Sequence, residues 1–144
     1  MRTHEDLAEP ALAAILAGYR LGALGRCDVI ERGHVNEKWL VETELGQYLL
    51  KRRHASLRAP ALVQAQHALI QHLRDAGFPA PAPVPTRAGE PCLAHGGEVY
   101  EVQEYVAGDP YDAAQAAHLV ASARMLGTYH NDVSGFCHDA LCRP

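Results

Sequence analysis

The sequence predicts an α+β fold in which one helix packs on an antiparallel sheet of about five strands. Three strand-like segments follow one another within residues 28–53, and brief turns join them, as in an antiparallel meander. A segment with apolar residues at helical spacing then runs over residues 60–76. A chain of 144 residues fits one domain, or one lobe of a larger protein, and can bury a core without disulfides.

The first half of the chain predicts a short helix and then the meander. Residues 9–17 form the helix, because Pro10 suits its first turn and Gly18 follows its end. The strands are expected at 28–32, 38–43 and 47–53. The glycine turn GHVNE joins the first two, and Glu44-Leu45-Gly46 makes a hairpin between the second and third.

The second half predicts a longer helix that covers the sheet. It opens at Pro60 and stops at Gly77. Its sheet-facing side chains are expected to be those at steps of three and four, namely Leu62, Gln66, Leu69 and Leu73. His67 and His72 fall on the outer face, where we expect them to be solvated.

The remaining segments predict an extended stretch, a hairpin and a last helix. Prolines at 79, 81, 83 and 85 require extended backbone. Strands at 91–95 and 98–106 are turned by Gly96-Gly97. Residues 108–110 break the pattern like a linker, and Asp112 with Gln115 resembles the capping box of a helix that runs to about Tyr129.

Composition narrows the classes of partner. The net charge of -4 comes from interspersed acids and bases, which argues against nucleic acid or an anionic membrane as the main partner. The four cysteines form no CxxC pair, and the first residues lack the layout of a signal peptide. No apolar run approaches the roughly 20 residues that span a bilayer. We therefore expect a cytoplasmic protein with reduced thiols and no membrane segment.

A glycine turn at residues 33–36 lies close to the strand expected at 47–53, which carries Lys51 near its end. This arrangement puts one ammonium beside backbone N–H groups that can cover a phosphate chain. The motifs GHVN, GQYLLK, HLRDAGFPAPAPVPT, YEVQEYVAGDP and LGTYH follow in order. Their order and spacing over residues 19–130 resemble the aminoglycoside phosphotransferase family, and within it the homoserine-kinase-like and choline-kinase-like small-molecule kinases. The resemblance implies a protein-kinase-like N-terminal lobe over 1–106, then a hinge and the first helix of an incomplete C-terminal lobe over 107–144.

The resemblance also implies a nucleotide site for ATP. Lys51 would contact the α- and β-phosphates, and the turn would cover them with Gly33, His34, Val35 and Asn36. The backbone of the hinge would receive the adenine edge through Gln103, Glu104, Tyr105 and Val106. The alternatives are that Lys51 is one of three solvated bases at a strand end, with Arg52 and Arg53, and that the hinge is an ordinary edge strand.

Kinase-like lobes usually pair this lysine with a glutamate on the following helix. Here Gln66 takes that position, and residues 60–74 contain no acid. Three interpretations follow. The pair is weakened, the lysine is held differently, or Gln66 is a half-buried polar residue on an apolar face.

No catalytic or metal-binding residue is predicted. His130-Asn131-Asp132 imitates the family's His-x-Asp catalytic loop, but Cys137 stands where a magnesium-binding asparagine is required, so we interpret the match as a decoy. Cys137, His138 and Cys142 do not provide the four donors of a structural zinc site.

The main functional hypothesis is a truncated ATP-dependent phosphotransferase. In the complete enzyme, the γ-phosphoryl group would pass to a hydroxyl of a small molecule with the help of Mg²⁺. The sequence does not identify this acceptor, and these 144 residues alone are expected to show no turnover. Two alternatives stay open: a non-catalytic nucleotide-binding or interaction module that pairs with a separate chain supplying the second lobe, and a gene fragment without function.

Overall fold

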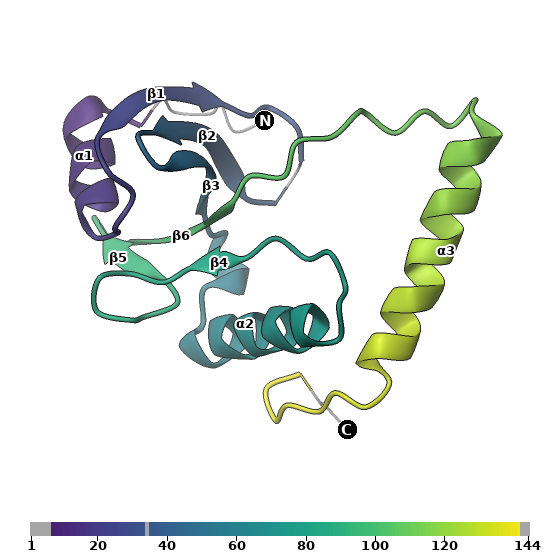
Figure 1. Cartoon of the computed structure of the whole chain (residues 1–144). Coiled ribbons are helices and arrows are strands. Elements are labelled where there is room, and N and C mark those ends of the chain that lie inside the picture. Colours follow the sequence, from purple (N-terminus) through teal and green to yellow (C-terminus); the bar gives the residue numbers. More distant parts are fainter. Residues whose placement is uncertain (1–6, 34, 142–144) are drawn as a thin grey trace.

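The computed structural model describes residues 7–33 and 35–141. Within them a six-stranded antiparallel sheet has the strand order β1-β2-β3-β6-β4, and β5 also pairs with β6 (Figure 1). The strands are β1 (Leu24–Val29), β2 (Glu37–Thr43), β3 (Gly46–Arg52), β4 (Pro83–Val84), β5 (Leu93–His95) and β6 (Glu98–Glu104). The helices are α1 (Glu9–Ala17), α2 (Pro60–Asp75) and α3 (Ala116–Val133), with a 3-10 turn at Ala55–Leu57.

One face of the sheet forms the hydrophobic core against α1. The antiparallel register places Trp39 opposite Leu50 and Leu50 opposite Val102, so these side chains form a row across β2, β3 and β6. Ile15 of α1 and Tyr19 just after it pack against this row. All of these side chains are at most 2 % exposed, so α1 closes the apolar face of the sheet.

The opposite face of the sheet is polar at its centre. Successive side chains of a strand point to opposite faces, so Lys51 and Glu101 point away from the core that Leu50 and Val102 build. The helix α2 lies near this side of the sheet (Figure 1). The polar groups of β3 and β6 thus meet α2 rather than α1.

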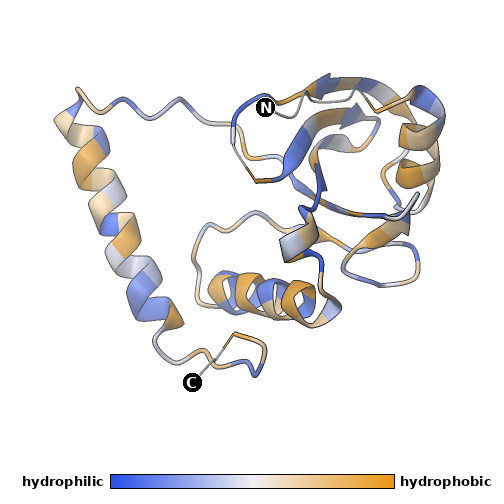
Figure 2. Cartoon of the chain, turned by 180° about the vertical axis from the view of Figure 1, so that it is seen from behind, coloured by the Kyte–Doolittle hydropathy of each residue, from blue (hydrophilic) through white to orange (hydrophobic). Residues whose placement is uncertain are grey.

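The helix α3 stands apart from the sheet (Figure 1). It contacts α2 near its C-terminal end, where the His72 ring nitrogen lies 2.7 Å from the Asp132 carbonyl oxygen and the Phe78 and Tyr129 rings lie 5.9 Å apart. None of the described side chains of α3 is buried. Figure 2 shows apolar residues along this helix, and the exposed ones are Leu119, Val120, Met125 and Leu126. No helix in residues 7–33 and 35–141 has the length and apolar character needed to cross a membrane.

The structure confirms the α+β fold class and corrects several boundaries. The meander, both flanking helices and the Gly96-Gly97 hairpin are present, but β1 lies earlier than predicted, because the pairing with β2 begins at Leu24. A sixth strand is added where Pro83 and Val84 pair with β6. The amide of Gln115 does bond to Asp112, at 3.0 Å, yet this pair lies in the turn before α3, which then continues past Tyr129.

Candidate functional site

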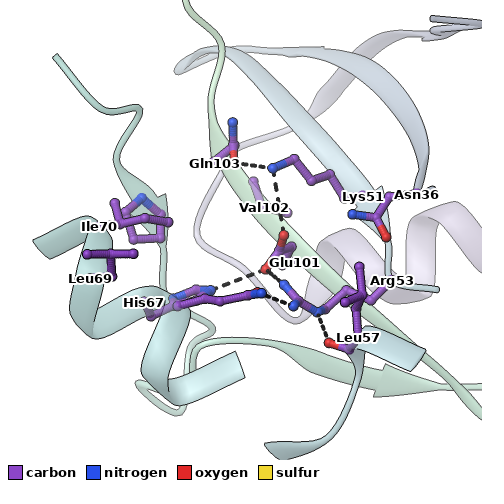
Figure 3. A pocket seen from close by; sticks show the side chains of 12 residues that line it. Asn36, Lys51, Arg53, Leu57, His67, Leu69, Ile70, Glu101, Val102 and Gln103 are labelled. Atoms are coloured by element: carbon purple, nitrogen blue, oxygen red, sulfur yellow. Dashed lines mark hydrogen bonds and ion pairs between the residues drawn. The ribbon is translucent and has the colours of Figure 1, made fainter. Parts of the chain in front are cut away.

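A cavity of about 270 Å³ lies between α2 and the polar face of the sheet (Figure 3). Its lining comes from β3, β6, α2 and the segments beside them. The lining residues are Asn36, Lys51, Arg53, Leu57, Gln66, His67, Leu69, Ile70, Pro83, Glu101, Val102 and Gln103. The helix contributes both apolar and polar side chains, whereas the sheet brings charged groups together.

Lys51 is held by two side chains of β6. Its ammonium donates a 2.5 Å hydrogen bond to the side-chain oxygen of Gln103 and lies 3.7 Å from a carboxylate oxygen of Glu101. Burial lowers the pKa of Lys51, and the negative charge of Glu101 counteracts this effect. The register explains the contact, because Lys51 lies directly opposite Glu101 and residues 101 and 103 share one face of β6.

Arg53 is the most deeply buried charged residue in the lining. Its side chain is 3 % exposed and forms an ion pair with Glu101 at 2.6 Å. Its Nε group donates to the Leu57 carbonyl at 2.8 Å, and Nη2 donates to the side-chain oxygen of Gln66. The guanidinium therefore has partners in β6, α2 and the 3-10 turn, and it fixes these elements to one another.

Glu101 is the acidic centre of the cluster. Its carboxylate also lies 3.2 Å from the ring nitrogen of His67. Burial alone would raise the pKa of Glu101, but the His67 contact and the charges of Arg53 and Lys51 outweigh it, so the pKa falls to about 2. The residue is therefore ionised across the physiological range of pH.

The structure brings part of the predicted site together. Four of its residues line the cavity: Asn36, Lys51, Gln66 and Gln103. Gly33 lies in the turn before β2 with a φ of +106°, the Val35 side chain is exposed, and His34 lies outside the described residues. Of the three interpretations for Gln66, the contacts favour the one in which another residue holds Lys51. The Gln66 side chain bonds to Arg53, whereas a side chain of β6 bonds to Lys51.

The residues predicted to form a hinge are partly engaged in the sheet. The N–H of Glu104 donates to the Ala82 carbonyl at 2.9 Å, and that of Tyr105 donates to the Gln47 carbonyl at 3.1 Å. The Glu104 side chain forms an ion pair with Arg74 at 3.2 Å. The N–H of Val106 has no hydrogen bond to the part of the chain that the structure describes.

The alternative of three solvated bases and the expectation of two solvated histidines both disagree with the structure. The three bases at the end of β3 are all paired. Arg52 binds Glu37, and its guanidinium lies 6.0 Å from the Trp39 ring centre. Lys51 and Arg53 line the cavity, where both contact Glu101. His67 lines the cavity, and the His72 ring contacts the end of α3. Both histidines are half-buried because further elements pack beside α2, which the helical period alone does not reveal.

Sequence reasoning missed Arg53, Glu101 and His67 as members of the cluster. A signal for Glu101 was present, because it alternates with Tyr100 and Val102 and so had to face away from their core. The register between β3 and β6, which brings it to Lys51, is not readable from either strand alone.

The other candidates for chemistry lie elsewhere. His130, Asn131 and Asp132 are inside α3, so they do not form a loop. Within residues 7–33 and 35–141, no group of three or more His, Cys, Asp or Glu side chains could hold a metal ion. Among the described residues that line the cavity, Glu101 is the only carboxylate, and one of its oxygens is bound to Arg53.

The α+β fold is that of a kinase-like N-terminal lobe, and its strand β3 carries the half-buried Lys51. A sequence model of the phosphotransferase enzyme family matches residues 26–138. The chain belongs to this family.

Known relatives agree with this assignment. The chain is 29 % identical over 136 residues to a homoserine kinase of Caulobacter vibrioides and 28 % identical over 136 residues to a homoserine kinase of Phenylobacterium zucineum. These matches cover 94 % of this chain but 43 % and 42 % of the relatives. The chain therefore spans less than half the length of the curated relatives that it matches.

Solved structures with the same fold also extend beyond this chain. An aminoglycoside phosphotransferase from Alicyclobacillus acidocaldarius superposes with a TM-score of 0.75 at 24 % identity, over 99 % of this chain and 40 % of that one. The amicoumacin kinase hAmiN, solved in complex with AMP-PNP, Ca²⁺ and Ami, superposes with a TM-score of 0.76 at 17 % identity, over 92 % of this chain and 42 % of that one. At these identities the likeness shows the fold.

Proposed function

We propose that this chain is the nucleotide lobe of an ATP-dependent small-molecule phosphotransferase. The observation that carries the proposal is the Lys51 ammonium, held by β6 at a cavity between the sheet and α2. Preorganised positive charge is what phosphoryl transfer needs around the phosphate oxygens. The family's kinases, including the one solved with AMP-PNP, support ATP as the nucleotide.

The charges of the cavity suit a phosphate chain. Its lining has two basic side chains, Lys51 and Arg53, and one carboxylate, Glu101, so basic groups outnumber acidic ones by one. A volume of about 270 Å³ lies just below the usual range of small-molecule sites, so the cavity can hold part of a nucleotide. In this proposal Lys51 contacts the phosphates, the backbone of the turn at Gly33 to Asn36 covers them, and the Val106 N–H meets the adenine edge.

The lining does not suit a magnesium ion. Mg²⁺ prefers carboxylate oxygens and water, and the single carboxylate of the cavity is bound to Arg53. We therefore propose that residues 1–106 serve the nucleotide, that residues 107–144 begin the second lobe, and that metal ligands and acceptor site belong to the part of the relatives that the match does not reach. On this proposal, the 144-residue chain alone binds ATP weakly and transfers no phosphoryl group.

The alternative of a module docked on a separate chain gains no support from the comparisons. In each relative described above, the matched region is part of one longer chain. The exposed apolar side chains of α3 suit either a second lobe in the same chain or a separate partner.

Calorimetric titration with ATP, tripolyphosphate and adenosine tests the proposal. Lys51→Ala is expected to weaken binding of ATP and of tripolyphosphate about tenfold and to leave adenosine unchanged, because it removes one charge-assisted hydrogen bond to phosphate. Arg58→Ala is the matched control, since Arg58 pairs with Glu98 at the surface, outside the cavity lining. Equal ATP affinity of the wild type and Lys51→Ala would remove Lys51 from the site.

A further inference from the structure

The carboxylate nearest to Lys51 comes from a strand and not from the helix. Glu101 and Lys51 are direct partners in the register of β3 and β6, and Gln103 lies two residues further on the same face. The helix position that would usually carry the acid is Gln66, and its side chain is bonded to Arg53. As Figure 3 shows, the Lys51 ammonium has contacts to β6 and none drawn to α2.

Glu101 is suited to hold a cation. Its side chain is 10 % exposed, and its two oxygens divide their contacts. Oε1 faces Lys51 at 3.7 Å, whereas Oε2 faces Arg53 at 2.6 Å and His67 at 3.2 Å. Because the arginine and the histidine fix one oxygen, the other keeps a constant direction toward the lysine.

We propose that Glu101 is the positioning residue for Lys51, in place of a helix glutamate, and that Gln103 completes the clamp through its amide oxygen. This inference rests on the proposed function, in which Lys51 contacts the phosphates. Lysine and carboxylate here belong to neighbouring strands of one sheet. The register of the sheet therefore sets the backbone positions of both partners, unlike the strand-to-helix pair of protein kinases, which helix movement makes and breaks.

Selective NMR of the lysine side chains tests the pairing. The chain has two lysines, Lys38 and Lys51, so ¹³C-lysine labelling gives two signals, and Lys38→Arg assigns them. Glu101→Gln keeps the shape but removes the charge that raises the pKa of Lys51, so this pKa is expected to fall. An unchanged Lys51 titration would overturn the proposal.

The affinity for ATP distinguishes a positioning role of Glu101 from a simple effect of its negative charge. Glu101→Gln makes the cavity more positive, so charge alone predicts tighter ATP binding, whereas lost positioning predicts binding about tenfold weaker. Tighter or equal binding would overturn the positioning role. If the wild type binds no ATP while the Lys51 titration still responds, the proposed function fails and the Lys51–Glu101 pair is judged by the titration alone.

Three further variants keep the result interpretable. Glu98→Gln removes a carboxylate of the same strand that pairs with Arg58 at the surface, and it is expected to leave the Lys51 titration unchanged. If Glu101→Gln does not fold, Glu101→Asp replaces it in the titration. The shorter side chain keeps a negative charge for Arg53 but moves the carboxylate away from Lys51. Gln66→Leu is expected to leave the Lys51 titration unchanged, and a shift as large as that of Glu101→Gln would overturn the strand-based clamp.

Discussion

Arg53 and Glu101 form a buried ion pair whose atoms lie 2.6 Å apart, with side chains that are 3 % and 10 % exposed. The pair joins the end of β3 to the middle of β6, 48 residues away along the chain. Forming such a pair costs desolvation free energy, which offsets the attraction between the two charges. Its main effect on stability therefore appears when one partner is removed and the other charge is left buried without it. The pair therefore links the stability of the fold to the arrangement of charged groups in the candidate site.

Arg53→Met is expected to destabilise the chain by about 3 kcal/mol, because it leaves the buried Glu101 charge without its nearest partner. The measurement is urea unfolding followed by the fluorescence of Trp39, the single tryptophan, which is 2 % exposed. Arg26→Met is the matched control, since Arg26 pairs with Asp28 at 2.7 Å but both side chains are exposed. The control is expected to cost less than about 1 kcal/mol. Equal losses would show that burial does not distinguish the two pairs.

Glu101 is expected to make the free energy of unfolding depend on pH in the acid range. Its pKa is about 2 in the folded chain against an ordinary value of 4.5, so the unfolded chain binds more protons between these values. Its contribution, about 3 kcal/mol, is fully present above pH 4.5 and is lost as pH falls toward 2.

Urea unfolding at several values between pH 2 and pH 7 checks the acid dependence. Glu101→Gln is expected to show a flatter profile than the wild type, and Glu98→Gln is expected to keep the wild-type slope. If the profiles of the wild type and Glu101→Gln run parallel, the carboxylate of Glu101 is not the group that titrates.

The fold was predictable where local rules determine the structure. Pro60 and Gly77 mark the ends of the α2 prediction, and in the structure Gly77 has a φ of +87° just past the helix. The Gly96-Gly97 turn likewise has positive φ at both positions, as a tight hairpin requires. The start of β1 was not predictable, because LGRCDV has little alternation and only its pairing with β2 defines it.

The candidate site was predictable only in part. Lys51 was found because it lies near the end of the third strand of a meander whose first connection is a glycine turn. Its partner was sought on the helix, since sequence spacing indicates which residues share a helix face but not which strands become neighbours. The structure places β6 beside β3, and this contact between distant segments brings Glu101 and Gln103 to the lysine.

Gly33 is expected to be intolerant of a side chain because of its backbone conformation. Its φ of +106° is strained for other residues, whereas a Cβ there would meet the ammonium at the flexible end of Lys38, which can move aside at little cost. Gly33→Ala is therefore expected to cost about 1 kcal/mol, the size of the backbone strain alone. Gly89→Ala is the control, because Gly89 has a φ of +82° with open space around it. Chemical denaturation compares the two, and a clearly larger loss for Gly33→Ala would contradict the expectation, because it would mean that the Lys38 ammonium does not move aside.

The apolar side chains of α3 are expected to add little to the stability of this chain. Leu126 is 55 % exposed, whereas Leu50 is fully buried in the core row of β3. Leu126→Lys should therefore change the free energy of unfolding by less than about 0.5 kcal/mol, and Leu50→Ala should cost about 2–5 kcal/mol through lost burial and a cavity. Urea midpoints read by Trp39 fluorescence give both values. A loss for Leu126→Lys as large as that for Leu50→Ala would contradict the open position of α3, because it would require this helix to be packed against the rest of the chain.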